Sequence, residues 1–229
     1  MRDRMKALAA KAWRGLGILA LTKAVILFGA AGTLFYWQAW AYLAAFFAPA
    51  IIVTRYLMEN DPALLERRLS AGPTAEKERV QKVVMSLAMV GFIALIAVPA
   101  LDHRFNWSTV PVNLALIGDL MVVLGFYLVF LVYKENSFSS ATIQVAADQK
   151  VISTGPYAVV RHPMYAGSLP MLIGIPLALG SYWGLLALAA MMPALIWRLL
   201  DEERFLAKNL PGYREYCAKV RSRMIPGIF

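Results

Sequence analysis

Six long apolar runs constrain this chain more than any other feature of its sequence. They cover approximately residues 16–35, 38–57, 83–101, 112–133, 164–179 and 181–200. A helix needs about 20 apolar residues to cross a bilayer, because it rises about 1.5 Å per residue. The first four runs reach that length, whereas the fifth is shorter and contains Pro170 and Pro176, so we expect a kinked or tilted helix there. The sequence therefore predicts an all-α polytopic membrane protein with about six transmembrane helices.

The basic residues are distributed unevenly over the connections between these runs. Of the 23 Lys and Arg residues, 21 lie in the N-terminal segment, in the long connections after the second and fourth runs, and in the C-terminal segment. The positive-inside rule predicts that both termini and residues 58–82 are cytoplasmic, in the inner membrane of a bacterium or the endoplasmic reticulum of a eukaryote. We expect a retained first helix, because its apolar run is too long for a signal peptide. We also expect Lys23, inside that run, to extend to the cytoplasmic interface.

The remaining composition excludes several kinds of site. The net charge of +9 arises in the connections, so we expect no nucleic-acid partner. The single cysteine, Cys217, excludes an internal disulfide framework. His103 and His162 lie on opposite sides of the membrane in the predicted topology, so we expect no metal site of Cys and His ligands.

Residues 155–167, GPYAVVRHPMYAG, form the densest polar cluster and lie where the fifth run begins. They combine a fixed cation, a titratable ring and two amphipathic aromatic side chains: Arg161, His162, Tyr157 and Tyr165. Pro163 is typical of the first position of a helix. Because the free N–H groups and the dipole at a helix N-terminus attract anions, this cluster is a candidate site for a carboxylate or a phosphate. The alternative is that these residues only anchor the helix at lipid headgroups.

Three consecutive acidic residues, 201–203, directly follow the sixth run. Carboxylates are unfavourable at a helix C-terminus, so we expect a cation nearby, either Arg198, Arg204 or Arg161 of the chain, or a cationic ligand. The short turn near Ser181 makes the last two runs an antiparallel hairpin, which brings both clusters together. A ligand with charges of both signs fits such a site. S-adenosylmethionine, phospholipid headgroups and free amino acids all have that property.

The two clusters belong to a longer pattern over residues 134–229. An RHP-x-Y-x-G motif follows NSFSSATIQVAADQKVISTGPY, and DEERFLAKNLPGYREYCAKVRSRMIPGIF follows the two-helix hairpin. This pattern resembles the isoprenylcysteine carboxyl methyltransferase and phospholipid methyltransferase superfamily. The resemblance implies one membrane domain, with a four-helix N-terminal part (1–133) and a methyltransferase core (134–229).

The resemblance also implies an S-adenosylmethionine site in a cytosolic cap above the last two helices. The residues that match the two motifs are His162, Tyr165, Gly167, Glu202 and Glu203. Those that fall in the C-terminal cap of the family are Tyr213, Arg221 and Arg223. We add Tyr157 to the predicted cofactor site, because it belongs to the same polar cluster.

The candidate catalytic residues are Arg161, His162 and Glu135, of which Glu135 lies just after the fourth run. An amine acceptor would lose its proton to His162 or Glu135, whereas a carboxylate or thiolate acceptor needs no base. Both motifs lie at the membrane edge, so we expect a lipid-like or lipidated acceptor that enters from the bilayer, as in an isoprenylcysteine carboxyl methyltransferase.

Other functions remain as alternatives. Phospholipid N-methylation fits the same superfamily, and a small thiol is a further acceptor class. The tail YCAKVRSRMIPGIF also resembles the end of membrane sterol reductases, which use NADPH. A non-enzymatic membrane scaffold is the last alternative.

Three connections carry local patterns. Residues 63–69 have the spacing of an amphipathic helix, which either lies in the membrane interface or forms a solvated linker. The β-branched runs 142–145 and 149–152 could pair as a small hairpin around residues 146–148. Residues 213–220 predict a short amphipathic helix on the cytosolic side.

Overall fold

The structure is a computed structural model that describes residues 2–229, apart from residues 71, 73, 75, 77, 146 and 147. Its long helices are α1 (Arg2–Ala31), α2 (Trp37–Asn60), α4 (Arg79–Phe105), α5 (Val112–Glu135), α6 (Pro163–Ala178) and α7 (Trp183–Asn209). Its short helices are α3 (Pro62–Leu69), the 3-10 helix η2 (Gly155–Ala158) and α8 (Tyr213–Lys219). The described residues contain no strand, which confirms the all-α prediction.

The transmembrane prediction is also confirmed. Helices α1, α2, α4, α5 and α7 are long and apolar enough to cross a membrane. Helix α6 is apolar but has only 16 residues, which corresponds to roughly 24 Å at 1.5 Å per residue. It contains Pro170 and Pro176, as the sequence indicated.

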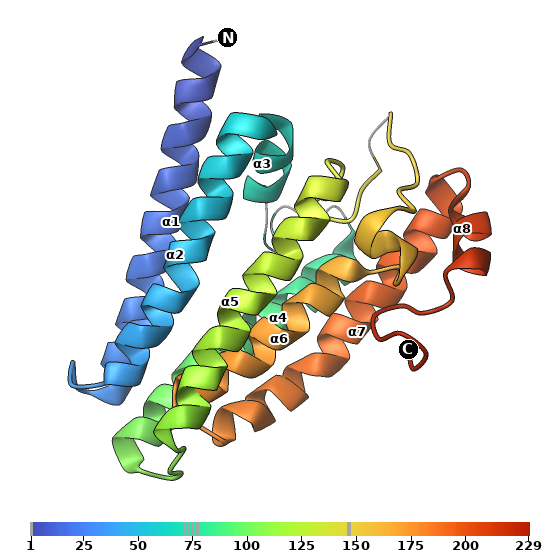
Figure 1. The fold of residues 1–229 in the computed structure, drawn as a ribbon. Coiled ribbons are helices and arrows are strands. Elements are labelled where there is room, and N and C mark those ends of the chain that lie inside the picture. Colours follow the sequence, from blue (N-terminus) through green and yellow to red (C-terminus); the bar gives the residue numbers. More distant parts are fainter. Residues whose placement is uncertain (1, 71, 73, 75, 77, 146–147) are drawn as a thin grey trace.

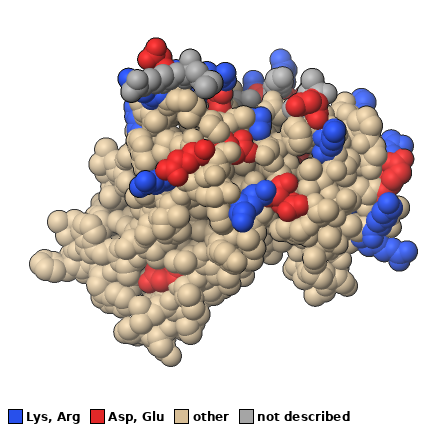
Figure 2. All heavy atoms as spheres, turned by 45° about the horizontal axis from the view of Figure 1, so that its top comes forward, with Lys and Arg blue, Asp and Glu red and all other residues tan. Residues whose placement is uncertain are grey.

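The helices form a bundle with two different ends (Figure 1). We call one the turn end, because the short turns 32–36, 106–111 and 179–182 lie there. The other carries α3, η2 and α8, and we call it the cap end. Figure 2 shows Lys, Arg, Asp and Glu side chains gathered over one part of the molecule, beside a broad surface with few charged residues. That separation is expected when one part faces water and the other faces lipid.

Glycines determine which helices pack closely. A Cβ atom on Gly118 of α5 would lie 2.3 Å from the backbone nitrogen of Ala178 in α6, and one on Gly174 of α6 would lie 2.6 Å from the carbonyl oxygen of Gly118. In the same way, a Cβ atom on Gly91 of α4 would lie 2.4 Å from Met191 Cγ in α7. Helix α6 therefore packs extensively on α5, and α7 on α4, while α6 and α7 share fewer contacts despite the short turn between them.

Buried polar groups hold the turn end together. Asp102, near the end of α4, is almost fully buried and accepts hydrogen bonds from the hydroxyls of Ser108 and Ser181. Tyr36 donates from its hydroxyl to the carbonyl oxygen of Leu179. These contacts fix the turns relative to one another, because each buried group finds its partner in a different turn.

Lys23 does not extend to the membrane interface, so that prediction is wrong. Its side chain is buried, donates to the Tyr42 hydroxyl at 2.7 Å and lies 4.2 Å from the centre of the Phe46 ring. Helix α2 thus supplies both an acceptor and an aromatic face, which satisfy the ammonium group inside the bundle.

The connections at the cap end differ from the predictions in one respect. Residues 142–145 and 149–152 form no strand, so the predicted hairpin is wrong for these runs, and residues 146 and 147 lie outside the described residues. The described part of this connection is held instead by side chains, since Arg67 and Arg68 of α3 donate to the carbonyl oxygens of Ser137 and Ser140. The predicted helices at 63–69 and 213–220 are confirmed as α3 and α8.

Candidate functional site

A cavity of about 460 Å³ lies between α4, α6 and α7 and continues to the cap end. Its polar part is lined by Tyr157, Arg161, His162, Tyr165, Glu202 and Tyr213. Its apolar part is lined by Met85, Phe92, Leu169, Leu172, Met192 and Leu195. The volume falls in the range of roughly 300–1,000 Å³ that is common for small-molecule sites. The splaying of α6 from α7 leaves this space, because each helix is packed closely on a different neighbour.

The RHP motif begins α6 and is joined to the C-terminal segment through the backbone. The N–H of Arg161 donates to the carbonyl oxygen of Ser222 at 3.0 Å, and that of His162 to the carbonyl oxygen of Arg223 at 2.9 Å. The Arg161 guanidinium also donates to the carbonyl oxygen of Arg221 at 3.1 Å. The C-terminal segment is therefore part of the wall that positions the motif.

Glu203 joins the two motifs predicted to form one site. One carboxylate oxygen lies 2.7 Å from Arg161 Nη1, and the other lies 2.9 Å from Arg223 Nε. His162 Nε2 lies 3.5 Å from the second oxygen. Burial by itself would lower the pKa of Arg161, but its hydrogen bond to Cys217 and the charge of Glu203 outweigh burial and raise it. The cap end of α6 is therefore bound to α7 by a cluster of charges.

Glu202 has a different environment from its neighbours in the acidic run. It lines the cavity and accepts a hydrogen bond from the Tyr165 hydroxyl at 2.9 Å. Asp201 accepts from Gln81, and Glu203 has its arginine partners. In the part of the chain that the structure describes, Glu202 makes no ion pair. Cations therefore pair with Glu203, whereas Asp201 and Glu202 make no ion pair among the described residues, and Arg198 reaches Glu202 only through the Tyr165 side chain.

Tyrosines close the cavity at the cap end. Burial raises the pKa of Tyr157 to about 12, and the Asn136 amide donates to its hydroxyl at 2.8 Å. Tyr216 donates to the carbonyl oxygen of Tyr157 at 2.7 Å, which links α8 to η2. Burial also raises the pKa of Tyr213, and its hydroxyl finds no partner among the described residues. A buried donor without a partner indicates room for a ligand atom.

Several predicted site residues lie beside the cavity rather than in its wall. Gly167 faces α5, where an added Cβ atom would lie 3.1 Å from Leu128 Cβ, so this glycine permits close helix packing. Glu135 accepts a hydrogen bond from the Thr154 hydroxyl and supports the turn before η2. Glu203 and Arg223 act on the cavity through Arg161 and His162.

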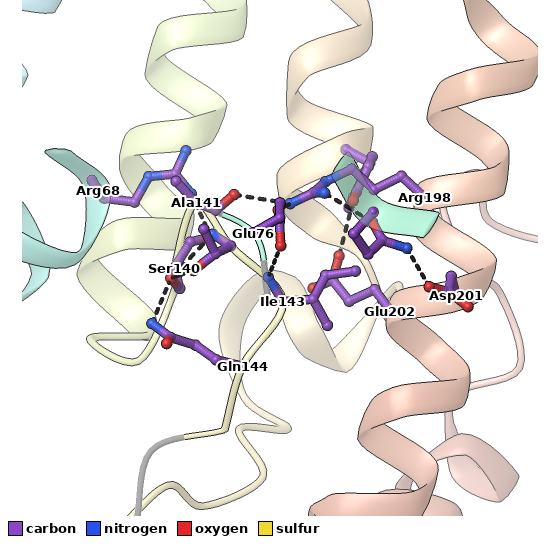
Figure 3. A network of polar contacts seen from close by, with 12 residues as sticks. Arg68, Glu76, Ser140, Ala141, Ile143, Gln144, Arg198, Asp201 and Glu202 are labelled. Atoms are coloured by element: carbon purple, nitrogen blue, oxygen red, sulfur yellow. Dashed lines mark hydrogen bonds and ion pairs between the residues drawn. The ribbon is translucent and has the colours of Figure 1, made fainter. Parts of the chain in front are cut away.

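A second polar network was missed by the sequence analysis (Figure 3). Arg198 of α7 lines the cavity and pairs with Glu76, which comes from the connection between α3 and α4. Gln81 of α4 accepts from Arg198 and donates to Asp201. From the sequence, we had predicted only that Arg198 could be a partner of the acidic run 201–203. Glu76 stands in a connection without helical periodicity, so nothing local indicated its burial.

Comparisons with known proteins identify the family of this chain. Residues 114–211 match the phospholipid methyltransferase family, a segment that runs from α5 to the turn before α8 and includes both motifs. The chain is also 30% identical over 165 residues to the cobalt-zinc-cadmium resistance protein CzcN of Cupriavidus metallidurans. The aligned segment covers 70% of this chain and 68% of that protein. The chain therefore belongs to the membrane methyltransferase superfamily of isoprenylcysteine carboxyl methyltransferases and phospholipid methyltransferases.

Proposed function

We propose that this protein uses S-adenosylmethionine to methylate a lipid-like or lipidated acceptor. The observation that carries the proposal is a single cavity that joins a polar cap to an apolar space between transmembrane helices, and the cap contains Glu202, a carboxylate without an ion pair among the described residues. A polar cofactor and an apolar acceptor need these two environments side by side, because methyl transfer requires the reacting atoms to be held within contact distance.

The cap residues fit the cofactor by charge. When bound, S-adenosylmethionine supplies the methyl group. Glu202 and the faces of Tyr157 and Tyr213 would hold its ammonium and sulfonium groups. Arg161 and the N-terminus of α6 would hold its carboxylate. The Tyr213 hydroxyl is buried without a hydrogen-bond partner among the described residues, and a ligand in the cavity would satisfy it.

The apolar part of the cavity fits an acceptor that arrives from the bilayer. Phe92 lies roughly 20 Å along α4 from Arg79, at 1.5 Å per residue. It lines the cavity and yet is 42% exposed, so the apolar part reaches the lipid-facing surface. Residues 1–133, which supply α4, would thus shape the acceptor site, while residues 134–229 supply most of the cofactor site.

Two acceptor chemistries are compatible with the superfamily. One is the carboxylate of a prenylated cysteine, which is already a nucleophile and needs no base. The other is the amine of a phospholipid, which would first lose a proton to a base. The cap end would face the cytoplasm, because the basic connections end there.

Calorimetry of the purified protein in lipid nanodiscs tests the proposal. S-adenosylhomocysteine should bind with one site per chain, and NADPH should release no measurable heat. A Glu202→Gln variant should lose at least about tenfold in affinity for S-adenosylhomocysteine, because a charge-assisted contact is worth roughly 1.5–3 kcal/mol. Binding of NADPH and not of S-adenosylhomocysteine would assign the chain to the reductase alternative instead.

A further inference from the structure

Arg198 and Glu202 of α7 lie four residues apart, a spacing at which opposite charges can pair on one face of a helix. The two side chains nevertheless make no ion pair with each other. The Tyr165 hydroxyl lies between them, since it accepts a hydrogen bond from Arg198 and donates to Glu202 Oε2 at 2.9 Å. The guanidinium is therefore separated from the carboxylate by one hydrogen-bonded group.

Three groups from distant segments hold Arg198 in this position, and Figure 3 shows its guanidinium pointing toward two of them, Glu76 and Ala141. Its Nη2 lies 2.8 Å from Glu76 Oε1 and donates to the carbonyl oxygen of Ala141 at 2.9 Å. Its Nη1 donates to Gln81 Oε1 at 3.0 Å. Of these three partners, Glu76 is the one with a charge, so it is the partner that offsets the charge of the guanidinium.

Glu76 is itself fixed by burial and by a second contact. Its side chain is only 2% exposed, and that of Arg198 is 10% exposed. The backbone N–H of Ile143 donates to Glu76 Oε2 at 3.4 Å. Breaking a buried ion pair is costly, because the remaining charge then stays away from water without compensation. The pair therefore keeps Arg198 directed toward Glu76 rather than toward Glu202.

The direction of Arg198 matters because this side chain and Glu202 both line the cavity. Without Glu76, the guanidinium would keep its charge and lose its carboxylate partner. Asp201 already accepts a hydrogen bond from Gln81, whereas Glu202 is joined to Arg198 through Tyr165 and has no ion pair among the described residues. A direct ion pair between Arg198 and Glu202 would occupy the carboxylate assigned above to the cationic groups of the cofactor.

We propose that Glu76 is a positioning residue, which holds Arg198 away from Glu202 and so keeps Glu202 available to the cationic groups of the cofactor. Tyr165 maintains the separation, since its hydroxyl proton is donated to Glu202 while its oxygen accepts from the arginine. This inference rests on the proposed function, because it requires a cationic ligand at Glu202. Glu76 precedes the segment 114–211 that matches the family, so the family match gives it no role.

Calorimetry of the protein in nanodiscs with S-adenosylhomocysteine tests the inference through a loss of affinity and its rescue. Glu76→Gln should lower the affinity about tenfold or more, because Arg198 would then compete with the ammonium group of the ligand for Glu202. The double variant Glu76→Gln with Arg198→Gln should bind within about threefold of the wild-type affinity, because no guanidinium remains to occupy Glu202. Damage to the fold alone would not be repaired by a second substitution in the same buried pair.

A second ligand distinguishes competition for Glu202 from general damage to the cavity. Methylthioadenosine has the nucleoside and thioether groups of S-adenosylhomocysteine but lacks its ammonium and carboxylate groups. The affinity for methylthioadenosine should differ by less than about threefold between the wild-type protein and Glu76→Gln. Glu78→Gln, which removes an exposed carboxylate from the same connection, is the matched control and should leave both affinities unchanged.

Several outcomes would overturn the role of Glu76. These are an unchanged affinity for S-adenosylhomocysteine in Glu76→Gln, an equal loss for both ligands, and a loss that the double variant does not restore. If Glu76→Gln fails to fold, the double variant leaves neither charge unpaired and still decides, because a loss of more than about tenfold there would contradict the inference. Failure of the wild-type protein to bind S-adenosylhomocysteine would instead overturn the proposed function, and this inference with it.

Discussion

Replacing Glu203 by Gln should weaken cofactor binding although Glu203 does not line the cavity. Its carboxylate holds Arg161 at 2.7 Å and Arg223 at 2.9 Å, and both Arg161 and His162 form part of the cavity wall. The substitution keeps the size of the side chain and removes its charge. Arg161 would then lose its carboxylate partner while its side chain, at 8% exposure, stays shielded from water.

The expected magnitude follows from the degree of burial. Breaking a fully buried ion pair costs about 3–5 kcal/mol, and an exposed pair contributes about 0–1 kcal/mol. Glu203 is 15% exposed and Arg223 is 34% exposed, so the pairs lie between these limits. We expect a loss of about 2–3 kcal/mol, which corresponds to a decrease in affinity of about 30- to 150-fold.

A double-mutant cycle measures this coupling directly. Calorimetry with S-adenosylhomocysteine on Glu203→Gln, Arg161→Gln and the double variant should give an interaction energy of about 0.5–3 kcal/mol, as is typical for residues in one network. Glu215→Gln, which removes an exposed carboxylate on α8, is the matched control. Additivity of the two losses within about 0.5 kcal/mol would refute the reasoning, because it would mean that Glu203 and Arg161 act independently.

Three further predictions test packing, ionisation and topology. Gly118→Ala places a methyl group 2.3 Å from the backbone of Ala178. The thermal midpoint of unfolding should therefore fall by the equivalent of about 1–3 kcal/mol. Gly17→Ala, which has open space around it, should have little effect. Burial raises the pKa of Tyr157 from 10.0 to about 12, so the neutral phenol stabilises the cap below pH 10 and this contribution is lost between about pH 10 and 12. Compared with Tyr157→Phe, the wild-type protein should therefore lose stability over that pH interval. Equal dependence of stability on pH in the two proteins would contradict the raised pKa of Tyr157. A cysteine introduced at Ser70 in a cysteine-free background should not react with membrane-impermeant thiol reagents added outside intact cells. Efficient labelling would contradict the predicted cytoplasmic location of residues 58–82.

Much of the site was accessible from sequence because its parts are local motifs. The apolar runs predicted the helices, since the length and composition of a segment decide whether it can cross a bilayer. The short turn near Ser181 placed the RHP motif and the acidic run at one end, and the structure brings Arg161 to Glu203 and Tyr165 to Glu202. What the sequence left open was which acid of the run pairs with the arginines.

That distribution of partners depends on how the helices rotate and separate. Arg198, Asp201, Glu202 and Glu203 are within two turns of one helix, and any of the acids could have met an arginine. Close packing at glycines draws α6 toward α5 and α7 toward α4, which opens the cavity and directs Glu202 into it.

The sequence by itself determined the membrane helices, the short fifth run and the two polar motifs, because each depends on residues close together in the chain. Only the tertiary structure decided the partners of the buried charges. Lys23 meets Tyr42 of the next helix, and Glu76 meets Arg198 across more than a hundred residues. Such pairs leave no periodic pattern in the sequence, since a buried charge is stabilised by whichever complementary group the packing of distant segments brings within reach.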